Sequence, residues 1–509
     1  MLPPTTSRPL SEPNKRAVFS PFISVFSPVS VLIRLSHTPC GAPGTPVLPH
    51  WMRDGTPAFR FDMIAVSAAR KRPHFIRRYR DMSQELSRRN FVRNSAVAAA
   101  AMAGPAVLPA LGQNEKINMG WIGTGGRGYY LLQRAYDGNA SAVNVTAVCD
   151  TFSTNMNRGK DLVATRQGRA PKAVADYKEI LNDKSIDAVV IATPEHLHHR
   201  MLLDALAAGK HVYVEKPLSH TIEEAQEILK VSKTSKSIVQ VGTQNRSNSL
   251  YQMAKTMIEQ GIIGNCHYTR AFWYRNALPT GAAAWRYSIP EDLSAQTADW
   301  QRFLGPASKR EFNRARYSQW RLYWDYSSGI ATDLMVHQTD VTAFVMGKGT
   351  PSSIIASGGV YRWTENDDRD VPDTWSVLLD YEAEKFHVNY SCYLGNAKFG
   401  YGEQFCGNEG TIEVINRSTL NYYPEVFAPG MNENVKERKE LTITIPRNDN
   451  LAVEAHIRNF LNAIKGKEQA IAPVRAGFDA VVAGLLSVVS YREGKKILWD
   501  AKTDTYKRA

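Results

Sequence analysis

Cysteine is scarce in this chain of 509 residues, which contains only five. Cys40 lies near the start, and Cys149, Cys266, Cys392 and Cys406 are widely scattered without any CxxC spacing. Such spacing indicates neither a disulfide framework nor a zinc site, so we expect no bound metal. Sparse, unpaired thiols suit a protein that folds in a reducing compartment.

Strong charge is also absent from most of the chain, although its formal net charge is +13. Residues 1–112 carry 15 Lys and Arg against 5 Asp and Glu, which leaves only +3 for residues 113–509. That body lacks the basic character of nucleic-acid binding proteins, so we exclude a nucleic-acid partner. It also lacks an uninterrupted run of ~20 apolar residues, so no stable membrane span is predicted.

The basic N-terminal region contains SRRNFVRNS at residues 87–95, followed by an alanine-rich stretch. Two adjacent arginines, a modest apolar run and small residues are typical of a twin-arginine export signal. We therefore predict a signal peptide over 82–112 and a periplasmic or exported protein. Met82 is an ordinary start for such a signal, so we interpret residues 1–81 as an over-extended reading frame. A disordered N-terminal arm is the alternative.

From residue 117 the chain alternates short apolar strands, such as AVVIA (188–192), with helices of ten to fifteen residues. This alternation predicts a parallel sheet covered by helices on both faces. After about residue 240, several longer segments alternate apolar and polar residues, which indicates a mainly antiparallel sheet with one open face. We expect the open face to support a homo-oligomer, either a dimer or a tetramer.

The segment INMGWIGTGGRG (117–128) places a GxGxxG pattern between the first strand and its helix. Its glycines permit a tight turn, close approach of a pyrophosphate, and close packing of helix on strand. Asp150 ends the next strand, where a carboxylate accepts hydrogen bonds from ribose hydroxyls and repels a 2′-phosphate. NAD is therefore the predicted cofactor, although Arg158 and Lys160 leave NADP open. The turn residues predicted to bind the dinucleotide are Gly123, Thr124, Gly125, Gly126, Arg127 and Gly128.

The predicted fold is therefore α/β, with two domains. Residues 117–240 form an N-terminal Rossmann dinucleotide-binding domain. Residues 241–509 form a C-terminal α+β domain for substrate binding and oligomerisation.

Two further segments, AVVIATPEHLHHRM (188–201) and AAGKHVYVEKPLSHT (207–221), are similar to those of the Gfo/Idh/MocA oxidoreductases. That family includes glucose–fructose oxidoreductase and inositol dehydrogenase, and the resemblance covers nearly all of residues 117–500. It implies that the lysine of EKP, here Lys216, contacts substrate beside the nicotinamide. The residues that it places beside the cofactor are Thr193, Pro194, His198, Glu215 and Gln244.

The resemblance also includes a D-x3-H pair in the second domain, supplied here by Asp333 and His337 of GIATDLMVHQTD. Oxidation of a secondary alcohol requires a base for the hydroxyl proton, and a histidine titrates near neutrality. The four-residue spacing predicts Asp333 on the same helical face, able to orient the imidazole or to hold a second hydroxyl. Lys216 is expected to stabilise negative charge on the reacting oxygen.

The remaining polar and aromatic segments favour a carbohydrate substrate over a metal. His196, His198 and His199 have no carboxylate or cysteine partner at ligand spacing, so we predict no metal site there. Aromatic rings pack against the C–H faces of sugars, and arginines bind their hydroxyls. Segments of this composition are FWYRN (272–276), DWQRFLGP (299–306) and RYSQWRLYWDY (316–326).

The leading interpretation is an exported NAD(P)-dependent oxidoreductase that acts on a secondary alcohol of a sugar, glycoside or polyol. A distinct alternative is a glycosidase or lyase that uses NAD transiently, and a third is a cofactor-binding sensor without activity. Retention of Lys216, Asp333 and His337 favours the dehydrogenase. Because the space outside the inner membrane offers no dependable nicotinamide, we expect the cofactor to be loaded before export and held tightly.

Overall fold

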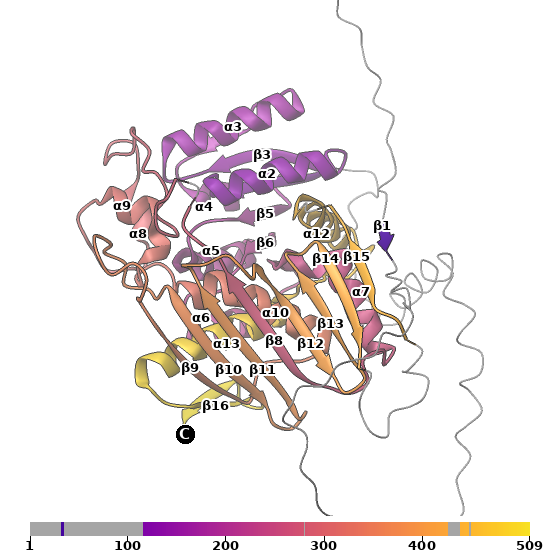
Figure 1. Ribbon diagram of the computed structural model, residues 1–509. Coiled ribbons are helices and arrows are strands. Elements are labelled where there is room, and N and C mark those ends of the chain that lie inside the picture. Colours follow the sequence, from indigo (N-terminus) through magenta and orange to yellow (C-terminus); the bar gives the residue numbers. More distant parts are fainter. Residues whose placement is uncertain (1–31, 35–115, 279, 426–437, 447–448) are drawn as a thin grey trace, which may run out of the picture.

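The computed structural model (Figure 1) describes residues 32–34, 116–278, 280–425, 438–446 and 449–509. The predicted signal over 82–112 lies outside the described residues. The predicted leader over 1–81 also lies outside them, apart from the short strand β1 (Leu32–Arg34). β1 pairs antiparallel with β15 (Leu441–Thr444) at one edge of the larger sheet.

The first domain is built on a six-stranded sheet. Its strands are β2 (Ile117–Ile122), β3 (Val143–Cys149), β4 (Lys172–Val174), β5 (Ala188–Ile191), β6 (His211–Glu215) and β7 (Val239–Gly242). They lie in the order β4-β3-β2-β5-β6-β7, and every neighbouring pair is parallel. All residues of β5 and β7 are buried, as expected for strands covered on both faces. The predicted Rossmann-like domain is confirmed.

Helices and short helical turns connect these strands. They are α2 (Gly126–Asn139), α3 (Ser153–Gln167), α4 (Tyr177–Asn182), η2 (Glu195–Leu197), α5 (His198–Ala207), α6 (Ile222–Ser232) and η3 (Gln244–Ser247). Helix α6 begins with a capping box, in which the Thr221 hydroxyl accepts from the Glu224 amide while the Glu224 carboxylate accepts from the Thr221 amide. This reciprocal pair satisfies two amides at the start of the helix.

The second domain carries an eleven-stranded sheet that includes β1 and β15. Its other strands are β8 (Cys266–Tyr274), β9 (Ser353–Gly359), β10 (Thr374–Tyr381), β11 (Phe386–Tyr393), β12 (Tyr401–Gly407), β13 (Gly410–Ile415), β14 (Thr419–Pro424), β16 (Ile497–Asp500) and β17 (Thr505–Arg508). The order is β1-β15-β14-β13-β12-β8-β11-β10-β9-β16-β17, and only the β8–β11 pair among these is parallel. The mainly antiparallel sheet is therefore confirmed.

One face of this sheet is covered by helices and the other is open (Figure 1). The helices of the domain are α7 (Ser249–Glu259), α8 (Trp300–Leu304), α9 (Arg314–Ser318), η4 (Trp320–Leu322), the π-helical turn η5 (Ile330–Leu334), α10 (Met335–Met346), α12 (Asp449–Ile464) and α13 (Val474–Glu493). Strand β11 alternates buried and half-buried residues along its length. On the open face Tyr268, Ile355 and Leu378 are exposed.

Helix α13 is the one described helix whose length and apolar composition match a membrane span. It packs against α10, α6 and β9, and 83% of its most apolar stretch is buried inside the protein. Length and composition of this kind also belong to the central helix of a folded domain. In this fold α13 is a core helix.

Helix α12 follows the large sheet in sequence but packs against the first domain, beside α2 (Figure 1). The Tyr130 hydroxyl donates to the Asn450 side-chain oxygen at 2.6 Å, and Arg134 Nη1 lies 3.2 Å from Glu454 Oε1. Val453 enters the same hydrophobic cluster as the core of the parallel sheet. The second half of the chain therefore completes one side of the nucleotide-binding domain.

Candidate active site

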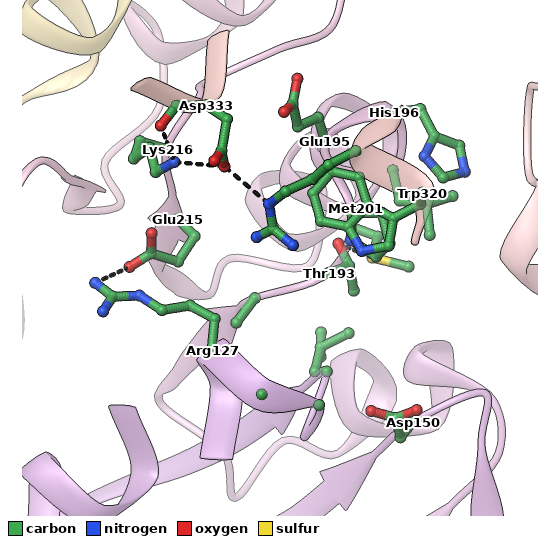
Figure 2. Close-up of a pocket in the computed structure, with 18 of the residues that line it drawn as sticks. Arg127, Asp150, Thr193, Glu195, His196, Met201, Glu215, Lys216, Trp320 and Asp333 are labelled. Atoms are coloured by element: carbon green, nitrogen blue, oxygen red, sulfur yellow. Dashed lines mark hydrogen bonds and ion pairs between the residues drawn. The ribbon is translucent and has the colours of Figure 1, made fainter. Parts of the chain in front are cut away.

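A cavity of about 1410 Å³ lies where the two domains meet, and it is the larger of the two best-defined cavities among the described residues. The first domain lines it with the turns that follow β2, β5 and β6. The second domain lines it with η4, η5 and the end of β8. Figure 2 shows Asp150 at one end of this cavity and the pair Lys216 and Asp333 at the other. Ligands of open parallel sheets bind at this edge, beyond the carboxyl ends of the strands.

The glycine-rich turn leaves room for a ligand on one side and none on the other. Gly123 has a φ of +88°, and a Cβ there would lie 2.7 Å from the Ala192 carbonyl oxygen. A Cβ on Gly128 would lie 1.9 Å from the Gly123 carbonyl oxygen, so helix and strand pack closely there. Gly126 has no atom within 4 Å of the corresponding position and lines the cavity with Gly125. This shape fits a pyrophosphate approaching the N-terminus of α2.

Asp150 is held at the end of β3 by backbone amides. Its Oδ2 accepts from the Thr124 amide at 2.7 Å, and its Oδ1 accepts from the Phe152 amide at 2.9 Å. Burial raises the pKa of the Asp150 carboxyl above its usual value, and the hydrogen bonds from these amides offset part of that increase. Thr124 itself does not line the cavity, because its hydroxyl donates to the Asn155 carbonyl. Asp150 thus lines the cavity as a fixed acceptor.

Arg158 could in principle have bound the 2′-phosphate of NADP, but its side chain contacts other groups. Its Nη2 donates to the Thr124 carbonyl at 3.3 Å, and its guanidinium lies 4.4 Å from the centre of the Tyr129 ring. It does not line the cavity, whereas the Asp150 carboxylate does. A carboxylate at this position disfavours a 2′-phosphate, which is consistent with NAD.

Thr193 and Pro194 line the cavity as predicted, but His198 lies behind its wall. The ring nitrogens of His198 lie 2.7 Å from the Pro217 carbonyl oxygen and 2.9 Å from that of Thr193. The residue is 1% exposed, and burial lowers its pKa. The structure therefore places His198 between the Thr193 turn and the EKP loop, where the single N–H of a neutral imidazole donates to one of the two carbonyls.

The other two histidines of this segment face separate partners. His196 Nε2 lies 2.7 Å from the Phe303 carbonyl oxygen, and His199 Nε2 lies 2.9 Å from Glu227 Oε2. Among the described residues, no group of three or more His, Cys, Asp or Glu is placed to hold a metal ion. His196, His198 and His199 therefore do not form a common site.

Glu215 and Gln244 lie together on the cofactor side of the cavity. Glu215 Oε1 accepts from Arg127 Nη2 at 2.9 Å and from Gln244 Nε2 at 2.7 Å. The Gln244 amide also donates to the Tyr213 hydroxyl at 2.8 Å. Arg127 is the second residue of α2, so this network joins the glycine-rich turn to the EKP strand.

Lys216 and Asp333 meet across the domain boundary. Lys216 Nζ donates to the Asp333 backbone carbonyl at 2.6 Å and to its Oδ1 at 2.9 Å. Arg321, which the sequence reasoning did not single out, donates from Nε to the same Oδ1 at 3.0 Å. Burial alone would raise the pKa of Asp333, but Lys216 and Arg321 outweigh it and hold that pKa far below its usual range. One ionised carboxylate therefore joins two cations.

Among the described residues no hydrogen bond joins Asp333 to His337, although the charge of Asp333 offsets part of the decrease that burial causes in the pKa of the His337 imidazole. Asp333 lies in the π-helical turn η5, and His337 lies in α10, so the helical pitch changes between them. The four-residue spacing consequently does not produce the side-by-side geometry of a regular α-helix. Asp333 faces Lys216 instead.

His337 also lines the cavity, and its ring stacks on Trp273 with centroids 5.8 Å apart. Burial lowers the pKa of its imidazole well below the usual range, and the charges of Lys216 and Arg417 lower it further. Within the part of the chain that the structure describes, its Nδ1 has no hydrogen-bond partner. His337 is therefore neutral near pH 7.

Glu195 is a second cavity residue that sequence reasoning missed. Its Oε1 accepts from the Ser327 hydroxyl, and its Oε2 accepts from the Thr332 hydroxyl, each at 2.6 Å. Burial, and then the nearby Asp333 carboxylate, raise the pKa of Glu195 to about 7. The residue follows Pro194 directly, so it connects the first domain to the turn that carries Asp333.

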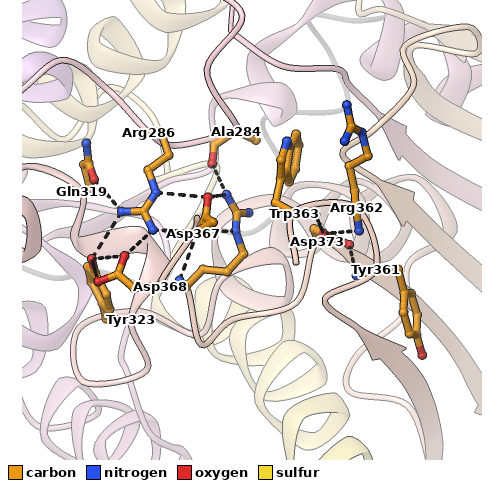
Figure 3. Close-up of polar contacts among 11 residues, drawn as sticks. Ala284, Arg286, Gln319, Tyr323, Tyr361, Arg362, Trp363, Asp367, Asp368 and Asp373 are labelled. Atoms are coloured by element: carbon orange, nitrogen blue, oxygen red, sulfur yellow. Dashed lines mark hydrogen bonds and ion pairs between the residues drawn. The ribbon is translucent and has the colours of Figure 1, made fainter. Parts of the chain in front are cut away.

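The aromatic rim is fixed by a cluster of arginines and aspartates (Figure 3). The Arg286 guanidinium makes two bonds to Asp367, 3.1 Å from Nε and 2.6 Å from Nη2, and its Nη1 donates to Gln319 at 2.8 Å. Paired bonds of this kind fix orientation as well as adding energy. The neighbouring Tyr287 lines the cavity and is exposed, whereas Trp285 is buried in the core, so the cluster holds one exposed aromatic face in place.

A glycine-rich turn and a lysine–aspartate pair that share one cavity define a nucleotide-dependent oxidoreductase. Residues 117–243 match a family model described as an oxidoreductase family with an NAD-binding Rossmann fold. Residues 305–498 match the model for the C-terminal alpha/beta domain of the same family. The chain belongs to this family, the Gfo/Idh/MocA oxidoreductases, as its sequence motifs predicted. NAD is confirmed as its cofactor.

Curated relatives match part of the chain. A glycosyl hydrolase family 109 protein 1 from Shewanella sp. (strain ANA-3) is 28% identical over 231 residues. An alpha-N-acetylgalactosaminidase from Shewanella oneidensis is 27% identical over 230 residues. Each match covers 42% of this chain and 50% of the relative. The chain thus spans about half the length of the curated relatives it matches.

Solved structures resemble the fold over a longer range. Levoglucosan dehydrogenase in complex with NADH and levoglucosan has a TM-score of 0.57 and 19% identity, covering 77% of this chain and 99% of that one. A putative myo-inositol dehydrogenase from Sinorhizobium meliloti 1021 has a TM-score of 0.54 and 22% identity, covering 75% and 99%. These likenesses establish the shared two-domain fold.

Proposed function

We propose that this protein oxidises a secondary alcohol of a sugar, glycoside or polyol and transfers the hydride to NAD. The observation that carries the proposal is the placement of Lys216, Asp333 and His337 in the same cavity as the glycine-rich turn. A neutral imidazole, a cation and a nucleotide-binding turn are what this oxidation requires. The aromatic residues Tyr287 and Trp320, which line the cavity and are not fully buried, suit the C–H faces of a sugar.

Each of these residues has a distinct part in the reaction. NAD, when bound, supplies the acceptor for the hydride. His337, neutral near pH 7, accepts the proton of the substrate hydroxyl. Lys216, held by Asp333, directs a positive charge toward the oxygen on which negative charge develops. The side chains of Lys216 and Asp333 are 12% and 10% exposed, so water screens this charge only weakly.

The matched curated relatives favour one alternative, a redox-neutral glycosidase. Their names include an alpha-N-acetylgalactosaminidase, and a transient oxidation of the sugar would allow elimination of the glycosidic bond. The same Lys216, Asp333 and His337 would serve the oxidation step. The two functions differ in the final state of the cofactor and in the release of an aglycone.

A single-turnover experiment separates the two functions. Protein loaded with NAD is mixed with nitrophenyl glycosides and with the free sugars, while the absorbance of reduced nicotinamide and of nitrophenol is recorded. Net oxidation leaves reduced nicotinamide and a ketone and releases no nitrophenol. A redox-neutral cycle releases nitrophenol and returns the cofactor to its oxidised state. Absence of both signals with a broad sugar panel would reject both functions.

We also propose that the protein is exported through the twin-arginine route with NAD already bound. The SRRNF sequence, although outside the described residues, supports export of a folded protein. Even nanomolar affinity, about −12 kcal/mol, permits slow loss of a ligand into a compartment that lacks it. We therefore expect slow dissociation, and recycling of the cofactor by a second sugar or by a redox-neutral cycle.

The test of this proposal uses protein purified from the periplasm. It should retain nucleotide after extensive dialysis and show ping-pong kinetics with paired sugar substrates. An Arg88→Lys, Arg89→Lys variant should remain in the cytoplasm with its nucleotide bound. Empty protein that works only with millimolar added NAD would contradict the captive-cofactor proposal.

We also propose that the protein forms a homo-oligomer. The open face of the large sheet exposes Tyr268, Ile355 and Leu378, which supports association of copies through that face. Native mass spectrometry should show a dimer or a tetramer, and a monomer at micromolar concentration would contradict this.

A further inference from the structure

Arg321 presents part of its guanidinium to the substrate end of the cavity. It lies in η4, and its Nε is anchored to Asp333 Oδ1 at 3.0 Å. The centre of its guanidinium is 4.1 Å from the centre of the Trp320 ring, so the plane is also held by an aromatic face. Among the described residues, no hydrogen bond is made by Nη1 or Nη2, and the side chain is 24% exposed.

The charges around Arg321 do not balance. Lys216 and Arg321 share the single carboxylate of Asp333, which leaves about one positive charge in excess. Glu195 is another acid whose charge acts on Arg321, but burial raises the pKa of Glu195 to about 7, so it is only partly ionised near neutrality. A partly dehydrated guanidinium with free donors gains most from an ionised acceptor, because such charge-assisted bonds are roughly twice as strong as neutral ones.

We propose that the substrate is a sugar acid whose carboxylate binds the Nη1 and Nη2 donors of Arg321. These two donors lie in one plane, and they match the two oxygens of a carboxylate. A monoanion also neutralises the single excess charge, whereas a sugar phosphate carries a greater charge. This inference rests on the proposed sugar oxidation and specifies the class of sugar.

The test compares each sugar acid with its own methyl ester, which keeps the shape and removes the charge. NAD-loaded protein is assayed with glucuronate and galacturonate, their methyl esters, the parent hexoses and the hexose 6-phosphates. Binding is measured separately by isothermal titration calorimetry. We expect at least one acid to bind at least tenfold more tightly than its ester, with the ratio falling as salt is added.

Variants of two arginines identify the residue responsible. Arg321→Gln should bring the acid-to-ester ratio close to one, and Arg321→Lys should retain part of it because the charge remains. Arg316→Gln is the matched control, since Arg316 belongs to the same segment but pairs with Asp325 at 3.0 Å and does not line the cavity. Its acid-to-ester ratio should equal that of the unmodified protein.

The outcomes separate this inference from the proposed function. Esters or hexose phosphates that bind as tightly as the acids would overturn it, as would an Arg321→Gln variant that weakens acid and ester equally. Acids that bind through Arg321 but transfer no hydride would uphold this site and reject the oxidation. Hydride transfer from neutral sugars alone would uphold the proposed oxidation and reject the carboxylate site at Arg321.

Discussion

Replacement of Asp333 by asparagine tests whether one carboxylate organises the catalytic end of the cavity. Asp333→Asn keeps the size of the side chain but removes the negative charge that Lys216 and Arg321 share at 2.9 and 3.0 Å. The amide oxygen still accepts one hydrogen bond, so the two cations are left to repel each other. Both the orientation of Lys216 and the stability of the protein should suffer.

The size of the effect follows from the burial of the pair. Lys216 and Asp333 are 12% and 10% exposed, and breaking a buried ion pair costs about 3–5 kcal/mol. Because one hydrogen bond survives, we expect the free energy of unfolding to fall by about 3 kcal/mol, the lower end of this range. We also expect kcat to fall on the order of 10²-fold, because Lys216 is misplaced. The folded-state pKa of Asp333 is depressed, so its contribution is present above about pH 4 and declines as pH falls below that value.

Urea unfolding and steady-state kinetics on the NAD-loaded protein would measure both effects. Asp325→Asn is the matched control, because Asp325 also lies between two arginines, Arg310 at 2.7 Å and Arg316 at 3.0 Å, but outside the cavity. The Asp325→Asn substitution should lower the free energy of unfolding by less than about 1 kcal/mol and leave kcat unchanged. If Asp333→Asn behaved like this control, the carboxylate would have no organising role.

Four further variants follow from the site and from one buried acid. Asp150→Ala should weaken NAD binding and relax discrimination against NADP, and unchanged NAD affinity would show that this carboxylate is not the ribose ligand. Lys216→Ala and His337→Ala should each lower turnover by ~10²–10⁴-fold with NAD binding nearly intact, and losses below tenfold in both would reject the assignment. Burial raises the pKa of Glu403 to about 8, so its folded form holds a proton that the unfolded chain releases. The unmodified protein should therefore lose stability relative to Glu403→Gln by about 1.4 kcal/mol per pH unit between about pH 4.5 and 8, and parallel stability curves in urea would contradict this.

The sequence was informative where function depends on local spacing. The glycines of residues 123–128 and Asp150 come together because a strand, a turn and a helix follow one another directly. EKP stands where β6 ends, and Lys216 was identified through the resemblance of this motif to that of the family. The period of the apolar residues predicted a sheet covered on both faces in the first domain and a sheet with one open face in the second.

The spacing of residues along the sequence could not predict contacts between distant segments. Arg321 and Glu195 acquire their roles from Asp333, Ser327 and Thr332, which only tertiary folding brings to them. The π-helical turn that carries Asp333 has no signature in a single sequence, and its carboxylate bonds to Lys216 rather than to His337. His198 lies behind the cavity wall because its ring is held between the carbonyls of Thr193 and Pro217, and the spacing within each motif does not show that the two motifs meet there.

Helix α12 has a consequence for the order of events on the ribosome. Its residues Val453, Ile457 and Phe460 belong to the hydrophobic cluster of the first domain, and Phe460 lies against Tyr213 of β6 with ring centroids 5.9 Å apart. The Rossmann sheet therefore remains partly uncovered until translation has passed residue 464. The cavity wall is also incomplete until then, because Asn450, Ala452 and Val453 line it, so NAD can meet its finished site only after α12 has been synthesised.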